Sequence, residues 1–565
     1  MNTYYSPREG SDRAQQASER DLPPGWYVRL RGTRRARHVF KWLDLGALWQ
    51  SRNDFVARLH DPVNDMRRAW MRELAPADPN LVVDRRAPDG RCRVLVVGDP
   101  GEGDTSQWVL VPAILGLAAD SDFMVVCSDV IYPTGDVNDY PEKFFRPYER
   151  YGKPIYALPG NHDWYDQLQG FMFTFCDRLP PAGGMPPGDL HGLLRLLWRK
   201  PKPVDADTRE QRARFRGLPD PPQPAPYWVI DLGPLVLVGI DTGISGQLDR
   251  DQGDWLARVS REIDKPKVLV TGKPLIVDGQ YHPGPIEQRG FTVDDVVREP
   301  SHRYVAAIGG DIHNYQRYPV ALEDGRRLEY VVAGGGGAFM HATHRIEPVD
   351  LGIVSEDGSN PDPVRGDGFR SFPLRGASLE FYARVVRREL RHLIWRAAIV
   401  GAASSALAAL LLVWRAPRWW AIEVAILLAL PALVSALALR YVASLHGFRI
   451  AFFHRRTTLD ALDAATWLAE RMGGQPTRGP ARRLTPAQED LANLIWPRFR
   501  RTRGPLHSFF SEIFDIDDPP LYKQLLQLEV EPDALTISCY AAVGTEHEHD
   551  PPALEDQVRI PLAGG

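Results

Sequence analysis

Four short segments of the 565-residue chain carry polar side chains of the kinds that bind metal ions. They are VVGDPGEGD (96–104), SDVIYPTGD (128–136), LPGNHDWYD (158–166) and GGDIHNYQRY (309–318). Their carboxylate, amide, phenol and imidazole groups suit Mn, Fe, Zn or Mg, and they do not resemble a thiolate site. Two such cations need a bridging carboxylate, and together they can clamp the oxygens of an in-line phosphoryl displacement. The segments therefore predict metal-assisted chemistry.

Each segment follows a short apolar run that ends on a turn rich in Gly, Asp, Asn or Pro. Such runs occupy Val94–Val97, Phe123–Cys127, Pro154–Leu158, Leu235–Ile240, Lys267–Val270, Tyr304–Ile308 and Leu328–Ala333. Continuous apolar runs of this length are typical of strands buried on both faces, with helices between them. In such sheets the functional groups gather in loops at the carboxyl ends of the strands. The pattern predicts an α/β layered enzyme whose site contains Asp99, Asp129, Asn161 and Asp311.

The motifs GDPG, GNHD and GDIH occur in one order along residues 91–344. In that order they resemble the calcineurin-like metallophosphoesterase superfamily, specifically its purple-acid-phosphatase-like branch. The resemblance implies a four-layer β-sandwich flanked by helices. It also implies two metal ions and a phosphomonoester or phosphodiester substrate, hydrolysed by metal-activated hydroxide.

The resemblance assigns a role to each motif residue. Metal one would be held by Asp99, by the bridging Asp129 and by Tyr132 and His313, with Tyr132 replacing a histidine that many members carry at the position of Gly101. Asn161 resembles the amide ligand of metal two, which Asp311 would also bind. His162 resembles the imidazole that protonates the leaving group, and His282 lies near a substrate-contacting histidine of purple acid phosphatases.

Two positions depart from the family pattern, and both belong to metal two. Asp311 stands where the first histidine of a GHxH motif is expected, and Gly272 stands where the histidine of an HxP motif is expected. The more negative site that results favours Mn or Mg over Zn. Water or His282 would fill the vacant ligand position. The alternative is a catalytically degenerate fold that acts as a membrane-tethered binding or regulatory module.

Other interpretations of single residues stay open. Asp99 or Asn161 alone would serve as a helix cap, and Tyr132 alone as a core aromatic residue. Residues 190–200, LHGLLRLLWRK, form either a small helix packed on the domain or a lid that touches lipid headgroups. His341 and His344 lie on the surface or line the pocket.

Two apolar stretches between residues 393 and 440 have the length of bilayer-spanning helices. Ala397–Trp414 contains no charge, and Trp419–Leu439 contains only Glu423. A buried hairpin of a soluble protein is the alternative. Arginines cluster before and after the pair, whereas the turn has only Arg415 and Arg418, so the positive-inside rule predicts that both termini and the catalytic domain are cytoplasmic. The scattered cysteines and the absence of a signal sequence agree with this orientation.

Lys+Arg 68 and Asp+Glu 72 give a net charge of −4, which does not specifically indicate a nucleic-acid partner. The alternating apolar residues near the C-terminus predict a β-hairpin that joins the catalytic sheet. We divide the chain into an N-terminal region with a disordered tail and basic helices (1–90), a catalytic domain (91–345), a linker (346–392), a membrane hairpin (393–440), and C-terminal helices with the β-hairpin (441–565).

Overall fold

The computed structural model of the chain describes residues 49–181, 190, 192–322, 324–343, 346, 354–355, 368–374, 376–378, 380–381, 521–544 and 552–562. The predicted membrane hairpin (393–440) and the predicted C-terminal helices lie outside these residues. Within the described residues, no helix combines the length and the apolar character that a membrane crossing requires. All four cysteines are described, and they are buried and unpaired.

One sheet has six strands in the order β17-β16-β15-β2-β3-β4. Strands β2 (Cys92–Val97), β3 (Phe123–Val126) and β4 (Ile155–Ala157) run parallel to one another. Strands β15 (Leu521–Val530), β16 (Ala534–Gly544) and β17 (Ala553–Pro561) form an antiparallel meander. β15 pairs antiparallel with β2, with Leu526 opposite Val96. The C-terminal hairpin thus extends the sheet that begins near residue 92.

The second sheet has eight strands in the order β1-β5-β6-β7-β10-β12-β11-β14. Their bounds are β1 (Val82–Asp84), β5 (Trp228–Asp231), β6 (Val236–Ile240), β7 (Lys267–Thr271), β10 (Tyr304–Gly309), β12 (Arg327–Ala333), β11 (Tyr315–Ala321) and β14 (Arg370–Phe372). The central strands β6, β7, β10 and β12 are parallel neighbours. A small third sheet contains β13 (Val354–Ser355), β9 (Gln280–Tyr281) and β8 (Ile276–Val277).

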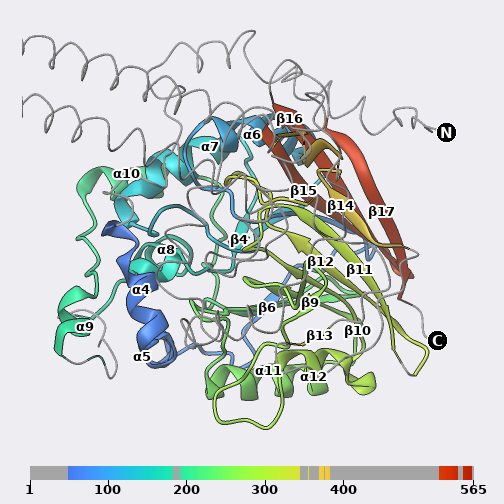
Figure 1. Ribbon diagram of the computed structural model, residues 1–565, viewed down its shortest axis with the longest axis horizontal. Coiled ribbons are helices and arrows are strands. Elements are labelled where there is room, and N and C mark those ends of the chain that lie inside the picture. The colour runs from blue at the N-terminus through green and yellow to red at the C-terminus, as the bar shows by residue number, and fades with distance from the viewer. Residues whose placement is uncertain are drawn as a thin grey trace, which may run out of the picture. The chain divides into compact units, whose positions relative to one another are not determined.

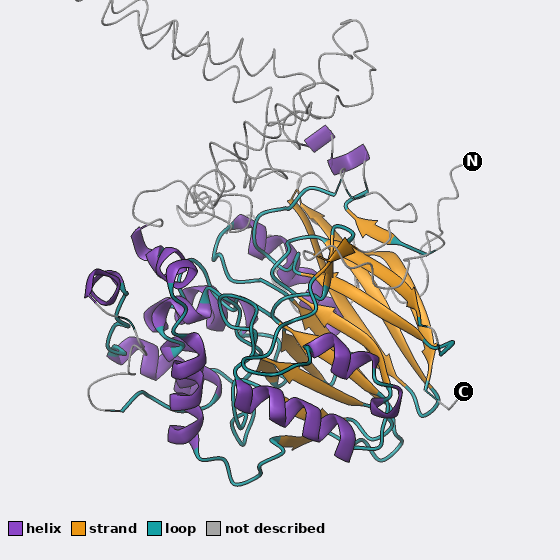
Figure 2. Ribbon diagram, turned by 60° about the horizontal axis from the view of Figure 1, so that its bottom comes forward, coloured by secondary structure: helices purple, strands orange, loops and turns teal. Residues whose placement is uncertain are grey.

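Apolar side chains of the two large sheets pack against each other. Val94, Val96 and Val125 of one sheet share a buried cluster with Val268 and Ile308 of the other. Helices cover the outer faces: α6 (Thr105–Ala118) and α8 (Gln169–Phe175) share a core with β2 and β3, whereas α11 (Arg250–Glu262) and α12 (Val293–Arg298) pack on the eight-stranded sheet. Figure 1 shows α11 and α12 on one side of the strands and α6 on the other, and Figure 2 shows the strands grouped together with helices outside them. The predicted α/β fold is confirmed.

The remaining helices are short or lie in connections. They are α4 (Arg52–Leu59), α5 (Val63–Leu74), η2 (Val137–Asp139), the π-helical turn η3 (Pro141–Phe145), α7 (Arg146–Tyr148), η4 (Asp163–Asp166), α9 (Gly192–Leu197), α10 (Ala206–Arg214) and η5 (Pro300–His302). Leu194 and Leu197 of α9 pack on the core, whereas Leu193 and Leu196 are exposed. The segment around α9 is thus a small packed helix with two exposed leucines.

Helices α4 and α5 precede the first large-sheet strand but are part of the same core. Val56 and Trp70 are buried in one cluster with Ile131 and Trp164. The Trp70 indole N–H donates to the carbonyl of Gln167 at 3.0 Å, and the Asn53 amide donates to that of Tyr165 at 2.8 Å. The described part of the N-terminal region therefore supports the loop that follows β4.

Candidate metal centre

The predicted site residues lie where strands of both large sheets end. Asp99 follows β2, Asp129 follows β3, Asn161 and His162 follow β4, and Asp311 follows β10. The three aspartates adopt positive φ angles of 55°, 31° and 65°. A non-glycine residue in this region costs on the order of 1–3 kcal/mol, and such residues cluster at functional sites. The fold thus accepts local backbone strain at each point where a carboxylate enters the site.

The hydroxyl of Tyr132 is the common neighbour of the residues predicted to hold metal one. Its oxygen lies 3.2 Å from Asp99 Oδ1, 3.1 Å from Asp129 Oδ2 and 3.1 Å from His313 Nε2. All four side chains are buried. Residues separated by up to 214 positions in the chain thus converge on one oxygen atom.

Gly101 has no room for a side chain, which explains why a tyrosine from another loop enters the site. A Cβ atom at position 101 would lie 1.9 Å from the carbonyl oxygen of Val130. The Gly101 carbonyl instead accepts a hydrogen bond from the Tyr132 N–H at 2.9 Å. The two loops are packed backbone to backbone, and the phenol of Tyr132 reaches the centre from the second loop.

The loops after β3 and β4 are joined through two aspartates. Asp129 Oδ1 accepts the His162 N–H at 2.8 Å, and the buried Asp163 accepts the N–H groups of Val130 and Gly160, both at 3.0 Å. A Cβ atom on Gly160 would lie 2.1 Å from Asp129 Oδ1. The absence of a side chain at Gly160 therefore lets the carboxylate of Asp129 lie between the loops. Asp163 positions these loops, a role that the sequence reasoning missed although it belongs to the GNHD motif.

His162 lies beside the Tyr132 cluster with a defined orientation. Its Nδ1 is 2.8 Å from the carbonyl oxygen of Pro133, and its ring centroid is 4.6 Å from that of Tyr132 and 4.7 Å from that of Tyr165. A carbonyl only accepts hydrogen bonds, so Nδ1 of His162 is the donor in this contact. Asn161 follows the same strand, and its amide donates to the Tyr165 hydroxyl at 2.9 Å.

Asp311 contacts Asp99, which is predicted to hold metal one, and it also contacts Lys273, which no motif indicated. Its backbone N–H donates to Asp99 Oδ2 at 2.8 Å. Its carboxylate oxygen Oδ1 lies 2.7 Å from the ammonium nitrogen of Lys273, the residue next to Gly272. A predicted ligand of metal two is therefore paired with a positive side chain.

Of the three other histidines considered for the site, His282 and His341 are described, and His344 lies outside the described residues. His341 Nδ1 accepts the His313 N–H at 2.9 Å, and the two rings stack with centroids 4.5 Å apart. His341 thus lies against His313, which is a candidate metal ligand. His282 follows β9, where its N–H donates to the carbonyl of Leu275 at 2.7 Å. Its substrate-contacting role stays a prediction.

Burial and like charges dominate the electrostatics of the centre. Burial, reinforced by Asp129 and Asp311, raises the pKa of Asp99 well above its ordinary value, and burial also raises the pKa of Asp129. Burial, followed by the charges of Asp129 and Asp99, raises the pKa of the Tyr132 phenol. Burial lowers the pKa of His313 to about 3, which leaves this imidazole neutral, the form that binds metals. A bound cation would favour the anionic form of each acid.

The side chains around the Tyr132 hydroxyl have the chemistry of a metal site, because they combine two carboxylates, a phenol and an imidazole. Among the residues that the structure describes, no group of three His, Cys, Asp or Glu side chains is by itself arranged to hold a metal. Tyr132 adds a further donor, because its hydroxyl oxygen lies between two carboxylates and a neutral imidazole. Oxygen and imidazole ligands of this kind suit Mn, Fe or Zn. The second position has one carboxylate already paired with Lys273 and a glycine in place of an imidazole.

Residues 92–315 match the family model of the calcineurin-like phosphoesterases. For this part of the chain the match confirms the resemblance to calcineurin-like phosphoesterases, whereas the purple-acid-phosphatase-like branch stays a prediction. No curated protein matches the sequence.

Three solved structures show weak similarity. A purple acid phosphatase from yellow lupin (Lupinus luteus) seeds is 14% identical with a TM-score of 0.30, and the match covers 47% of this chain and 46% of that one. The protein TT1561 of Thermus thermophilus is 14% identical with a TM-score of 0.26, covering 43% and 89%. PhoD is 11% identical with a TM-score of 0.27, covering 45% and 58%. The chain thus spans about half the length of the lupin enzyme.

Proposed function

We propose that the chain is a metal-dependent phosphoesterase that hydrolyses a phosphomonoester or phosphodiester. The observation that carries the proposal is the convergence of Asp99, Asp129 and His313 on the hydroxyl oxygen of Tyr132, at the carboxyl ends of strands from both sheets. The match of residues 92–315 to the phosphoesterase family supports the same reaction class. Tyr132, in place of a side chain at Gly101, supports the purple-acid-phosphatase-like branch.

In this proposal Asp99, Asp129, His313 and Tyr132 (the Tyr132 cluster) bind the metal ion, and His162 transfers a proton. A metal ion held there would neutralise phosphoryl oxygens and lower the pKa of a bound water. The Pro133 carbonyl holds Nδ1 of His162, so Nε2 can donate a proton to the leaving oxygen. Asp129 accepts the backbone N–H of His162, which ties the backbone of this residue to the carboxylate cluster.

The test is the variant Asp129→Asn in the full chain. We expect it to abolish hydrolysis of an aryl phosphate and of a bis(aryl) phosphate, and to lower bound metal greatly, with Mn, Fe, Zn and Mg each supplied. Asp264→Asn is the matched control, because the Asp264 side chain is 88% exposed and lies on a surface ion pair. Retained activity and metal in Asp129→Asn would refute the assignment. A metal-loaded wild-type protein without turnover would favour the binding-module alternative, for which the departures at Gly272 and Asp311 are the evidence.

We further propose that residues 393–440 anchor the enzyme in a lipid bilayer, with the catalytic domain and both termini in the cytoplasm. The support is the pair of apolar stretches and the distribution of arginine around them. Alkaline carbonate should leave the full chain in the membrane pellet, and protease added to sealed cells should cleave only near Arg415. Release by carbonate, or cleavage of the catalytic domain from outside, would contradict this topology.

A further inference from the structure

We infer that the ammonium of Lys273 takes the place of a second metal cation, so that the centre holds one metal ion and one built-in positive charge. The inference rests on the proposed function and specifies how its active site is built. Lys273 follows the end of β7, next to the loops that carry the other site residues. The hydroxyl of Thr271 donates to the Lys273 carbonyl at 3.0 Å and stabilises the turn.

The position of the ammonium is defined by its acidic neighbours. Lys273 Nζ lies 2.7 Å from Asp311 Oδ1, and both side chains are mostly buried. The N–H of Asp311 in turn donates to Asp99 Oδ2, so the ion pair lies directly against the metal-one residues. The ammonium therefore pairs with one of the carboxylates expected around metal two.

Neighbouring loops leave little space for a side chain at position 272. A Cβ atom on Gly272 would lie 2.8 Å from the Thr242 hydroxyl oxygen and 3.0 Å from the carbonyl oxygen of Pro159. A side chain there would meet the loop that carries Asn161, so it would need the Thr242 hydroxyl to rotate and the Pro159 carbonyl to give by a few tenths of an ångström. No imidazole stands at this position, and the positive group beside it is the ammonium of Lys273.

The charges of the centre support the same conclusion. Asp99, Asp129 and Asp311 place three carboxylates close together, and the ammonium of Lys273 offsets one of these negative charges. An ammonium is a compact point charge with three donors and no ligand positions. It can donate to an oxygen of the substrate phosphate, but it cannot coordinate a water molecule as a metal ion does. Water activation would therefore depend on the Tyr132 side of the centre alone.

The test counts metal ions. Full-length protein equilibrated with Mn²⁺ and then desalted should retain about one Mn per chain by elemental analysis. The variant Lys273→Met should gain a second, weaker Mn²⁺ equivalent because Asp311 loses its cation, and kcat should fall by about 10²-fold or more since one positive group at the phosphate is lost. Lys265→Met is the matched control, because Lys265 forms a similar ion pair with Asp231 at 2.7 Å. It should change neither quantity.

The outcomes separate this inference from the proposed function. Two Mn ions per wild-type chain with turnover would overturn the role of Lys273 and leave the phosphoesterase proposal intact. An unchanged stoichiometry and kcat in Lys273→Met would also overturn it, provided that circular dichroism shows a folded variant. Failure of the wild-type chain to bind metal or to turn over phosphate esters would overturn the proposed function itself.

Discussion

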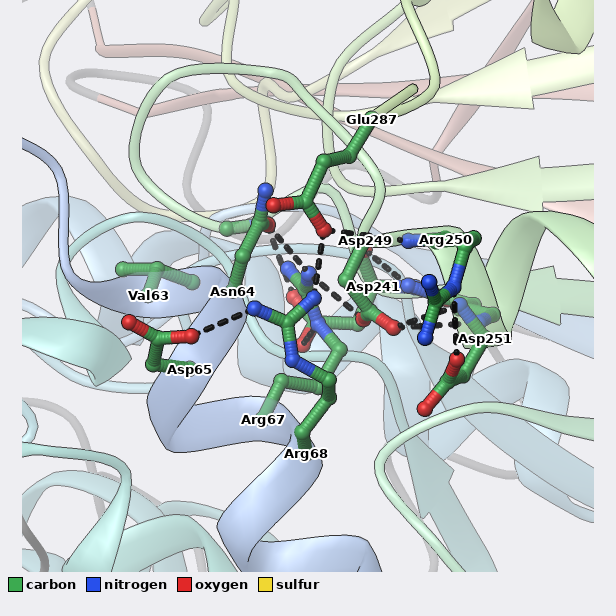
Figure 3. A network of polar contacts seen from close by, with 12 residues as sticks. Val63, Asn64, Asp65, Arg67, Arg68, Asp241, Asp249, Arg250, Asp251 and Glu287 are labelled. Atoms are coloured by element: carbon green, nitrogen blue, oxygen red, sulfur yellow. Dashed lines mark hydrogen bonds and ion pairs between the residues drawn. The ribbon is translucent and has the colours of Figure 1, made fainter. Parts of the chain in front are cut away.

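Replacement of the buried Arg67 by methionine should destabilise the protein far more than the same change at its neighbour Arg68. Figure 3 shows both side chains on α5 with their acidic partners. The Arg67 guanidinium is fully buried and lies 2.7 Å from Asp241 Oδ2 and 3.0 Å from Asp249 Oδ2. Methionine fills similar space but leaves both buried carboxylates without this cation.

The loss in free energy of unfolding follows from the contacts that the two carboxylates keep. Removing one partner of a buried ion pair costs about 3–5 kcal/mol. Asp241 Oδ1 still accepts the Trp164 indole N–H at 3.0 Å, and Asp249 Oδ1 still accepts two N–H groups at the start of α11. Because each carboxylate keeps these donors, we expect the lower end, about 3 kcal/mol. Arg68 also pairs with two carboxylates, Asp65 and Glu287, but at the surface, where such pairs contribute about 0–1 kcal/mol.

Thermal unfolding of the full chain in detergent, followed by tryptophan fluorescence, measures the difference. An unfolding entropy of about 2.1 cal/mol/K per residue over roughly 400 residues converts ~3 kcal/mol into a fall in Tm of about 4 °C. Arg68→Met should shift Tm by about 1 °C or less. Equal shifts for the two variants would refute the conclusion that Arg67 stabilises the fold through its buried ion pairs with Asp241 and Asp249.

Two further predictions concern the centre. Gly160→Ala should lower metal affinity and destabilise the fold by about 1–3 kcal/mol, because the new Cβ atom would lie 2.1 Å from Asp129 Oδ1 and push this carboxylate aside. Gly290→Ala is the control, because its Cβ atom would meet no atom within 4 Å. Equal Mn²⁺ affinities of the two variants in isothermal titration would contradict the prediction. His162→Gln should lower kcat by about 10²–10⁴-fold for a substrate with a basic leaving group while bound metal stays unchanged, and an aryl ester with an acidic leaving group should suffer less; an equal loss on both substrates would contradict a role in protonating the leaving oxygen.

The strand ends of the fold were predictable from local patterns. Apolar runs such as Val94–Val97 and Phe123–Cys127 mark strands buried on both faces, and the polar turns after them place Asp99 and Asp129 at one edge. The C-terminal hairpin was predictable for a similar reason, since alternating apolar residues need a sheet to cover them. Apolar periodicity and turn residues depend on positions only a few residues apart, so they can be recognised in a single sequence.

The partners of isolated polar residues were not predictable, because they depend on distant loops. Lys273 meets Asp311 only because β7 and β10 are neighbours in the sheet. Arg67 finds Asp241 and Asp249 more than 170 positions away. His341 stacks on His313 because the glycine-rich turn before it lies close to the backbone of Gly98. No spacing rule links such residues, so the sequence alone does not indicate these pairings.

The pairing of β15 with β2 has a consequence for synthesis of the protein on the ribosome. Arg93 and Glu529, which face each other across this pair, are separated by 436 positions. At about 5–20 residues per second, β2 waits roughly 20–90 s for its partner strand. Until then its edge is open to pairing with other nascent chains. β15 also donates the Gln524 N–H to the Gly335 carbonyl, in the turn beside Asp99. The turn beside Asp99 therefore gains this contact only after β15 has been synthesised.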